Sequence, residues 1–231
     1  MINNMMKTLK SHINEALKIG KNISKFSTYS CQPKTKDELK EIIKERMFRD
    51  GPNCDLNDID TSLITDMYGL FYRLKFNGNI SNWNTSNVTN MSYMFSYSNF
   101  NGDISDWDVS NVKEMTWMFN SSDFNRDISR WNVSQVEDMK QMFKMSKFNQ
   151  NISKWNVSNV KDMLSMFYQS EFNQPIGDWD VSNVKRMVAI FNRSKFNQDI
   201  SNWKISKDCV RFNMFDVCPI KEEFKPEVIK K

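Results

Sequence analysis

The chain has 231 residues, with 32 Lys or Arg against 28 Asp or Glu and a net charge of +4. No apolar run approaches the ~20 residues that a membrane-spanning helix needs, so we predict no integral membrane contact. The first ten residues lack the apolar core and cleavage site of a secretory signal, which predicts a cytoplasmic chain. The four cysteines lack metal-site spacing, which predicts reduced thiols and no metal site, with a Cys209–Cys218 disulfide as the alternative.

Two helical segments are predicted ahead of the rest of the chain. Residues 8–26 place four apolar side chains on one helical face and, with the linker that follows, form a basic leader over 1–33. Residues 34–50 predict an N-terminal capping helix, with Thr35 or Asp37 at its N-cap. The apolar stripe of this capping helix consists of Leu39, Ile42, Ile43 and Met47.

A 24-residue unit then recurs through residues 51–218. It carries a tryptophan in six consecutive copies, with Phe-Asn, Ile, Ser and Met at fixed positions. A fixed period in this range is typical of proteins that stack their repeats, because one unit alone cannot bury its apolar face. Projecting the unit back by 24 residues gives a seventh, variant copy with Ile59 in the tryptophan position. The six tryptophans, predicted to be structural core, are Trp83, Trp107, Trp131, Trp155, Trp179 and Trp203.

Each unit combines two apolar spacings. Ile104, Trp107 and Val109 follow the skeleton of a short strand, and Ser110 occupies the N-cap position of a helix that follows. The inward face of that predicted helix consists of Val112, Met115, Met118 and Phe119. We therefore predict an α/β fold, a leucine-rich-repeat-like solenoid with one short parallel strand plus one helix per repeat, about seven repeats and an N-terminal helical cap. Residues 219–231 are predicted to form a charged C-terminal tail.

For the polar and aromatic residues that recur in every unit, a structural role is preferred over a binding role. The Asn of Phe-Asn predicts a buried amide ladder that satisfies backbone groups at the bend. A column of tryptophans also suggests base stacking on a nucleic acid. An inward position on a strand is far more often core, so no nucleic-acid partner is predicted.

The positions that vary between units are the candidate binding residues. Outward positions on the predicted strands place basic residues centrally and acidic ones beside them, a pattern that a protein or glycan partner can read. Large side chains on the outer side of the predicted helices are candidate contact residues, with the covering of neighbouring helices as an equal alternative. The strand candidates are Asp106, Asp108, Arg130, Asn132, Lys154, Asn156, Asp178 and Asp180, and the helix-side candidates are Tyr93, Trp117 and Tyr168, with Tyr97 and Met145.

The sequence predicts no enzyme and no cofactor. The only histidine, His12, lies in the leader, and no Gly-rich phosphate loop is present. The pairs Asp106/Asp108 and Asp178/Asp180 offer oxygen ligands to a cation, but ordinary solvated carboxylates are the preferred interpretation.

The unit I-S-x-W-[N/D]-V-S-N-V-x-x-M-x-x-M-F closely resembles the BspA-like family of leucine-rich-repeat surface proteins. That family was long catalogued in mycoplasmas as a domain of unknown function. The segments 36–43 and 55–67 resemble the family's approach to its repeats, and the resemblance covers roughly residues 35–225. It implies a cell-surface location and a role in adhesion, against the cytoplasmic location expected from the N-terminus.

Two hypotheses for function follow from these observations. The first is a non-catalytic repeat scaffold that binds a protein or glycan, in the manner of an adhesin, through the variable columns and the exposed aromatics. The alternative is a structural or assembly component, phage-related in one version, that docks through the basic residues 1–50 and uses the repeats as a spacer.

Overall fold

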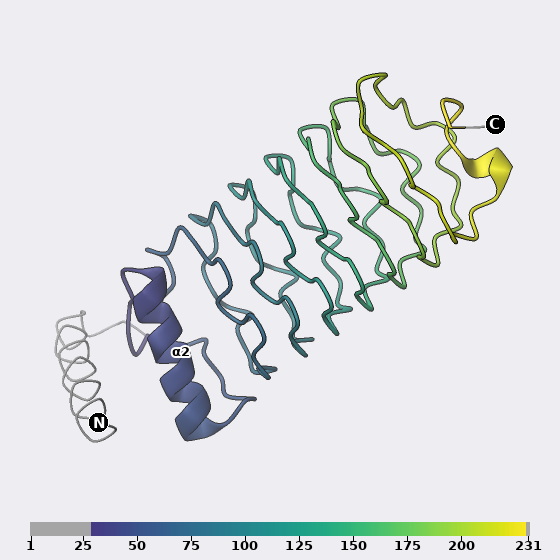
Figure 1. Ribbon diagram of the computed structural model, residues 1–231. Helices are drawn as coiled ribbons and strands as arrows, with labels where there is room; N and C mark the ends of the chain where they lie inside the picture. The colour runs from purple at the N-terminus through teal and green to yellow at the C-terminus, as the bar shows by residue number, and fades with distance from the viewer. Residues whose placement is uncertain (1–28, 230–231) are drawn as a thin grey trace, which may run out of the picture.

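The computed structural model describes residues 29–229, so the predicted leader helix over 8–26, with His12, lies outside the described residues. The described chain begins with helix α2, Lys36–Asp50, and continues as a stack of coils toward the short 3-10 helix η1, Glu222–Phe224 (Figure 1). One coil is one 24-residue unit. In this part of the chain, no helix is long and apolar enough to cross a membrane.

Helix α2 covers the N-terminal end of the stack. The Thr35 side chain accepts a hydrogen bond from the Glu38 N–H at 3.2 Å, and the Glu38 carboxylate accepts one from the Lys34 N–H at 2.7 Å. The first bond satisfies an amide group that the first turn of a helix leaves free, and the second ties the residue before the N-cap to that turn. Leu39 and Ile43 are fully buried, so the apolar stripe of α2 closes the first coil as a cap.

The predicted α/β solenoid, with a strand and a helix in each repeat, is wrong. Across residues 29–229, α2 and η1 are the only helices, and there is no strand or sheet. Neighbouring coils are joined instead by isolated parallel bridges between residues one period apart. Along the seven coils these bridges are Asp55–Asn79, Asp66–Asn90, Asn90–Glu114, Glu114–Asp138, Asp138–Asp162, Asp162–Arg186 and Arg186–Val210.

The segment that was predicted to be helical consists of turns that hydrogen-bond to the next coil. In residues 91–98, every second N–H donates to a carbonyl of the next coil, at N···O distances of 2.8–2.9 Å. The N–H groups of Met94, Ser96 and Ser98 close turns onto the carbonyl three residues back, whereas an α-helix would direct each one four residues back. The Ser92 N–H donates to the Asn90 side chain. We call this arrangement the turn ladder, and its segments are 67–74, 91–98, 115–122, 139–146, 163–170, 187–194 and 211–218.

Left-handed residues explain why the turn ladder is not a helix. Two residues per segment, four apart, have a positive φ, as in Tyr93 at 60° and Tyr97 at 55°. An L-residue in this conformation ends an α-helix and costs about 1–2 kcal/mol. Glycine supplies this position only once, at Gly69 in the first coil. The later coils hold Tyr93, Tyr97, Trp117, Ser121, Gln141, Met145, Ser165, Gln169, Ala189, Arg193, Asn213 and Val217 there.

The segment that was predicted to be a strand consists of two tight turns. The Trp107 N–H donates to the Ile104 carbonyl at 3.2 Å, and the Val112 N–H to the Val109 carbonyl at 3.0 Å. Between them, the Asp108 carboxylate accepts the Ser110 N–H at 3.0 Å. Short polar side chains bond their own backbone in this way and compete with strand pairing. The backbone hydrogen bonds that join the coils therefore lie in the segment that was predicted to be a helix. The segment that was predicted to be a strand forms corners of the coil.

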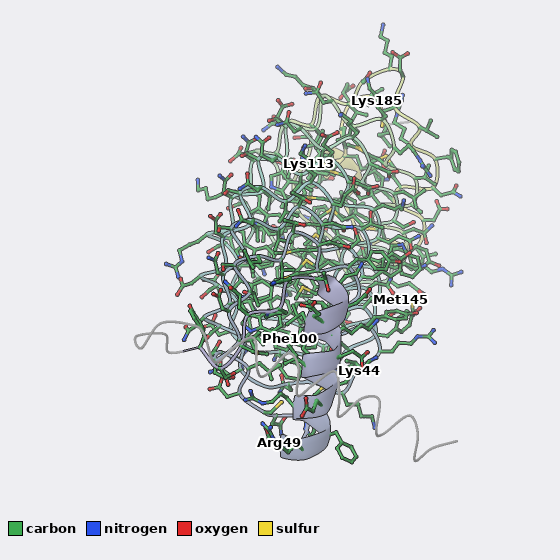
Figure 2. All side chains as sticks on the ribbon, turned by 90° about the vertical axis from the view of Figure 1, so that its left-hand side faces the viewer. Lys44, Arg49, Phe100, Lys113, Met145 and Lys185 are labelled. Atoms are coloured by element: carbon green, nitrogen blue, oxygen red, sulfur yellow. The ribbon has the colours of Figure 1, made fainter. Side chains whose placement is uncertain are left out.

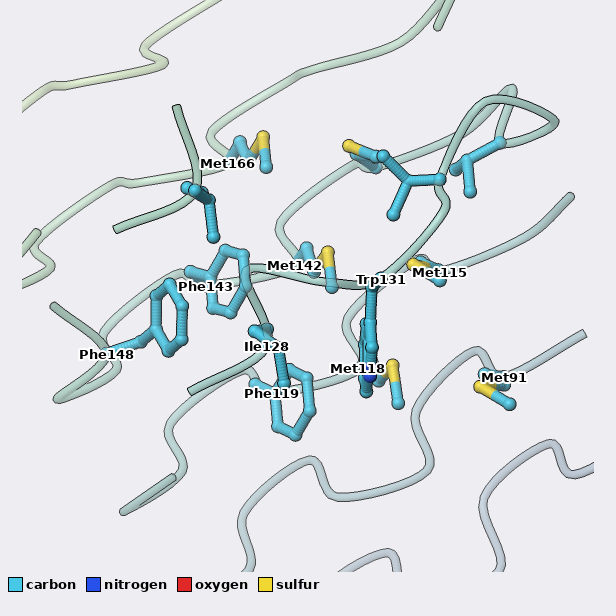
Figure 3. Packing of buried hydrophobic residues seen from close by; sticks show 14 of the residues in the cluster. Met91, Met115, Met118, Phe119, Ile128, Trp131, Met142, Phe143, Phe148 and Met166 are labelled. Atoms are coloured by element: carbon cyan, nitrogen blue, oxygen red, sulfur yellow. The ribbon is translucent and has the colours of Figure 1, made fainter. Parts of the chain in front are cut away.

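The core is a set of columns of identical side chains inside the stack. Figure 3 shows Phe119, Trp131 and Phe143 gathered among methionines of neighbouring coils. The six tryptophans are only 3–4% exposed, and Trp83 and Trp107 stack with centroids 6.3 Å apart. Each indole N–H donates to a carbonyl of the preceding coil, as Trp131 does to Ile104 at 3.0 Å. A buried indole needs such a partner, so the tryptophan fills the coil and also joins it to its neighbour.

Two further features join and close the coils. The Asn side chain of each Phe-Asn accepts a backbone N–H from the residue one period later, for example Asn125 from Asn149 at 2.9 Å, and at the last one Asn197 accepts from Lys221 at 3.2 Å. These side chains are half-buried in the coils after the first, and Asn77 is exposed. At the C-terminal end, within the predicted tail, Ile220 is buried and Phe224 packs against the last coils as a second cap.

Candidate functional site

The first outward column predicted for binding lies exposed at a corner of the coils. Asp106, Arg130, Lys154 and Asp178 are all exposed. The guanidinium of Arg130 pairs with Asp106 of the preceding coil at 2.6 Å, with both side chains well exposed to solvent. Pairs of this kind contribute about 0–1 kcal/mol, so this contact neither fixes the corner nor forms a shaped site.

The second outward column is a column of turns. The side chains of Asp108, Asn132, Asn156 and Asp180 each accept the N–H of the serine two residues later, at 3.0–3.2 Å. Hydrogen bonds from Ser110 and Ser182 lower the pKa of Asp108 and Asp180 below the usual carboxylate value. These oxygens are therefore committed to the fold. Among residues 29–229, no group of three or more His, Cys, Asp or Glu is placed to hold a metal ion.

A different surface gathers aromatic side chains on the turn ladder. Tyr68 lies 5.2 Å from Tyr93 between ring centroids, and Tyr93 stacks on Trp117 at 5.3 Å and 15°. Tyr72 meets both Tyr93 and Tyr97 edge to face at 6.2 Å. Aromatic pairs at such distances stabilise one another and hold each ring in place. We call the following set the aromatic strip: Tyr68, Tyr72, Tyr93, Tyr97, Trp117 and Tyr168.

Three cations lie over rings of the aromatic strip, and one of them, Lys36, which is 5.4 Å from the ring centre of Tyr68, is already paired with Asp66 at 2.6 Å. The other two are Arg73 and Lys144. The Arg73 guanidinium lies 5.2 Å from the ring centres of both Tyr72 and Tyr97. The Lys144 Nζ lies 5.5 Å from the ring centre of Trp117 and 5.3 Å from that of Tyr168. Each cation–π contact at an exposed site is worth about 0.5–1 kcal/mol. Neither Arg73 nor Lys144 has a carboxylate partner among the described residues, so the strip presents two uncompensated positive charges.

The aromatic strip is open to solvent although its side chains are large. Tyr72 and Tyr97 are 38% and 46% exposed, and the neighbouring Met145 is 50% exposed and reaches outward from the stack (Figure 2). Tyr97, Trp117 and Met145 occupy left-handed positions, where a bulky side chain adds strain. Burial raises the pKa of Tyr93, which keeps its phenol neutral. The chain thus carries this surface at a cost in stability.

Polar atoms lie buried without partners within the same ladder. The Ser96 hydroxyl and the Asn120 side-chain amide nitrogen have no hydrogen-bond partner, and both residues are at most 1% exposed. They share one column with Tyr72 and Lys144, at successive coils. An unpaired buried polar atom costs about 1–3 kcal/mol, so this part of the ladder is not optimised for stability alone.

Sequence reasoning located part of this surface. Tyr93, Trp117 and Tyr168 were candidates, and the structure brings Tyr93 and Trp117 together with Tyr68. Tyr68, Tyr72, Arg73 and Lys144 were missed. The 24-residue period indicates two of them, Tyr72 and Lys144, because both stand in the same column as the candidate Tyr168.

The cysteines offer no comparable site. Cys31, Cys54, Cys209 and Cys218 are all free, and burial raises the pKa of each thiol. A raised pKa keeps the thiol protonated and lowers its nucleophilicity.

Stacked 24-residue coils, joined in register and closed at both ends, define the class as a tandem-repeat protein. The family described as "Mycoplasma protein of unknown function, DUF285" matches twice, over residues 43–147 and 121–226, and the chain belongs to this family. The match confirms the mycoplasma-type family in the resemblance and does not extend to the BspA-like name. Neither a curated protein nor a solved structure matches the chain significantly.

Proposed function

We propose that the chain is a non-catalytic binding scaffold that captures a macromolecular partner, a protein or a glycan, on the aromatic strip. The observation that carries this proposal is the placement of exposed rings and two unpaired cations on the most regularly hydrogen-bonded face of the coils. Tyrosine, tryptophan and arginine are the residues that contribute most to binding at protein interfaces. A rigid backbone holds them, so little conformational entropy is lost when a partner binds.

The strip supports this proposal better than the outward columns do. Asp108 and Asp180 are committed to turns, and Arg130 is paired with Asp106. A partner that recruits these groups competes with their present hydrogen bonds and ion pair, which reduces the net gain on binding. Arg73 and Lys144 lie over aromatic rings and form no ion pair among the described residues, so a carboxylate that approaches from solvent displaces no carboxylate partner.

The test compares the two surfaces on the same folded chain. The strip variant is Tyr97→Ser with Met145→Ser, and the matched column variant is Arg130→Asp with Lys154→Asp. Immobilised protein is exposed to a glycan array and to a native protein extract, and bound material is quantified for each variant. We expect the strip variant to lose a ligand that the parent chain and the column variant both retain.

Other outcomes contradict the proposal in different ways. Loss of capture in the column variant alone would assign binding to the predicted strand columns. Loss of capture after deletion of residues 1–28, with α2 and its buried Leu39 and Ile43 left intact, would favour the docked structural component instead. Equal capture by all variants would exclude the strip.

A further inference from the structure

We infer that the aromatic strip recognises an extended, acidic protein segment, with Arg73 and Lys144 each binding one carboxylate of that segment. This inference rests on the proposed function, since it names the partner of the same surface. Its basis is the chemistry of the two cations, the covering of the ring faces, and the spacing of the cations along the stack.

Neighbouring rings hold Arg73 and Lys144 in positions where each can bind a carboxylate. Arg73 is held by Tyr72 and Tyr97, and Lys144 by Trp117 and Tyr168, at 5.2–5.5 Å. The rings restrict each side chain and remove part of its hydration without neutralising its charge. A carboxylate that arrives there forms a charge-assisted hydrogen bond, and with a guanidinium it does so through two parallel N–H groups. The partner therefore carries negative charge at two separate points.

The ring arrangement favours a protein over a polysaccharide. A sugar ring stacks on a free aromatic face, but Tyr93 and Trp117 stack on each other at 5.3 Å, and Lys144 lies over Trp117. What the strip offers to solvent is ring edges, phenol groups, two cations and the thioether of Met145. Aromatic residues, arginine and methionine are enriched in protein interfaces, where they contact side chains and backbone alike.

The spacing of the cations predicts the spacing of the carboxylates. Three periods of 24 residues lead from Arg73 to position 145, and Lys144 directly precedes that position. The two cations therefore lie three coils apart. Hydrogen-bonded neighbours are 4.7–4.9 Å apart, which separates the two cations by about 14 Å along the stack. An extended segment rises about 3.3 Å per residue and alternates its side chains, so acidic residues four apart span about 13 Å on one side. The residue midway between them then faces Tyr93 and Trp117.

The fluorescence of Trp117 is the signal that reports binding. The chain has seven tryptophans, and the six of the core column are 3–4% exposed, whereas Trp117 is half-buried beside Lys144. The probe is a capped peptide with two glutamates four residues apart and a leucine midway between them. Two control peptides place the glutamates three residues apart, on opposite sides of a strand, or replace both by glutamine. Binding is measured on the full chain by tryptophan fluorescence and by calorimetry.

We expect the first peptide to bind and both control peptides to bind at least about tenfold more weakly, as expected when a charged hydrogen bond is lost. Lys144→Met and Arg73→Met should each weaken binding about tenfold. The matched control is Arg193→Met, because Arg193 is an exposed cation on the same ladder that has no cation–π contact among residues 29–229. It should change binding less than twofold. Thermal unfolding of each variant verifies that the stack is intact.

Three results would overturn the inference. Equal binding of the glutamine peptide would show that charge is not recognised, and equal effects of Lys144→Met and Arg193→Met would show that only the general charge of the face matters. Tighter binding of a polyuronate than of the peptide would reassign the strip to an acidic glycan. None of these results would change the capture experiment that compares the strip variant, Tyr97→Ser with Met145→Ser, with the column variant. The proposed function is contradicted only if the strip variant captures as much ligand as the parent chain.

Discussion

At the scale of the residue, tryptophan combines packing with hydrogen bonding in every coil but the first. Trp131 is 3% exposed, stacks on Trp155 at 6.4 Å, and donates its indole N–H to the Ile104 carbonyl at 3.0 Å. Phenylalanine would fill much of the space but leave that carbonyl without the indole donor. The strict recurrence of tryptophan, where leucine-rich repeats use leucine, therefore follows from the carbonyl that each coil presents to the next.

Two substitutions of Trp131 separate these contributions. Trp131→Phe removes the hydrogen bond and should lower the free energy of unfolding by about 1–3 kcal/mol. Trp131→Ala also removes most of the ring and should lower it by about 3–5 kcal/mol. Urea unfolding of both variants measures the difference. If Trp131→Phe were neutral, the indole hydrogen bond would contribute nothing to joining the coils.

The sequence predicted the residue scale well because the period places equivalent side chains in columns. It predicted the tryptophans as core, and all six are buried. It did not predict which large outer residues would meet, because ring contacts such as Tyr68 with Tyr93 depend on the path between columns. The position of Arg73 between Tyr72 and Tyr97 depends on that path in the same way, whereas Lys144 could be found from the 24-residue column that it shares with Tyr72 and Tyr168.

At the scale of the element, the turn ladder shares its apolar spacing with a helix. In residues 91–98 the inward side chains include Met91, Met94, Phe95 and Ser98, which is the i, i+3, i+4, i+7 pattern of an amphipathic helix. A turn that repeats every four residues produces nearly the same pattern as a helical turn of 3.6 residues. Spacing alone therefore did not distinguish the two. The left-handed positions do distinguish them, but glycine occupies only one of these positions, Gly69, and the others hold residues of many types, which leaves no recurring signal in the sequence.

The strand prediction is wrong for a different reason. Its polar residues fit the outward face of a strand, but in the structure they form turns. Asn or Asp followed two residues later by Ser occurs at one or two corners of most coils, where the side chain accepts the serine N–H. This spacing is a known turn signal. The sequence contains this signal, but the apolar alternation around Trp107 also fits a strand and predicts one at the same residues.

These corners predict how stability depends on pH. Hydrogen bonds from the serine two residues later lower the pKa of Asp103, Asp108, Asp127 and Asp180. A lowered folded-state pKa stabilises the fold above the unfolded value near 3.9, and this contribution disappears as pH falls through the folded value. We therefore expect stability to fall between about pH 5 and pH 2.

A variant with all four residues replaced by asparagine tests this expectation. Asn84, Asn132 and Asn156 already form the same turn with an uncharged side chain, so the replacement preserves each corner. Urea unfolding should show little change near neutral pH and a smaller loss of stability on acidification. If the variant lost as much stability in acid as the parent chain, the corner carboxylates would not be responsible.

At the scale of the whole molecule, the coils form one continuous body because every level of interaction has the same 24-residue period. Backbone ladder bonds, indole hydrogen bonds, the Asn column and stacked rings all connect one coil to the next. The sequence predicted the period, the seven units and the family at its coarse level. It did not predict the path of the backbone within a coil, which the left-handed residues determine.

The central claim is that the coils are joined by ladders of turns with left-handed residues, and Ala189 tests it most directly. Ala189 has φ of 53°, and its side chain is only partly buried. Glycine adopts this conformation without the steric cost of a Cβ, so Ala189→Gly should raise the free energy of unfolding by up to about 1 kcal/mol. In a helix the same change would lower it by about 1 kcal/mol.

The matched control is Lys44→Gly, at an exposed position inside α2, which should cost about 0.7–1 kcal/mol. The measurement is urea unfolding of the parent chain and the two variants under identical conditions. A gain at Ala189 beside a loss at Lys44 is the result we predict. A loss at Ala189 as large as the loss at Lys44 would contradict the turn ladder.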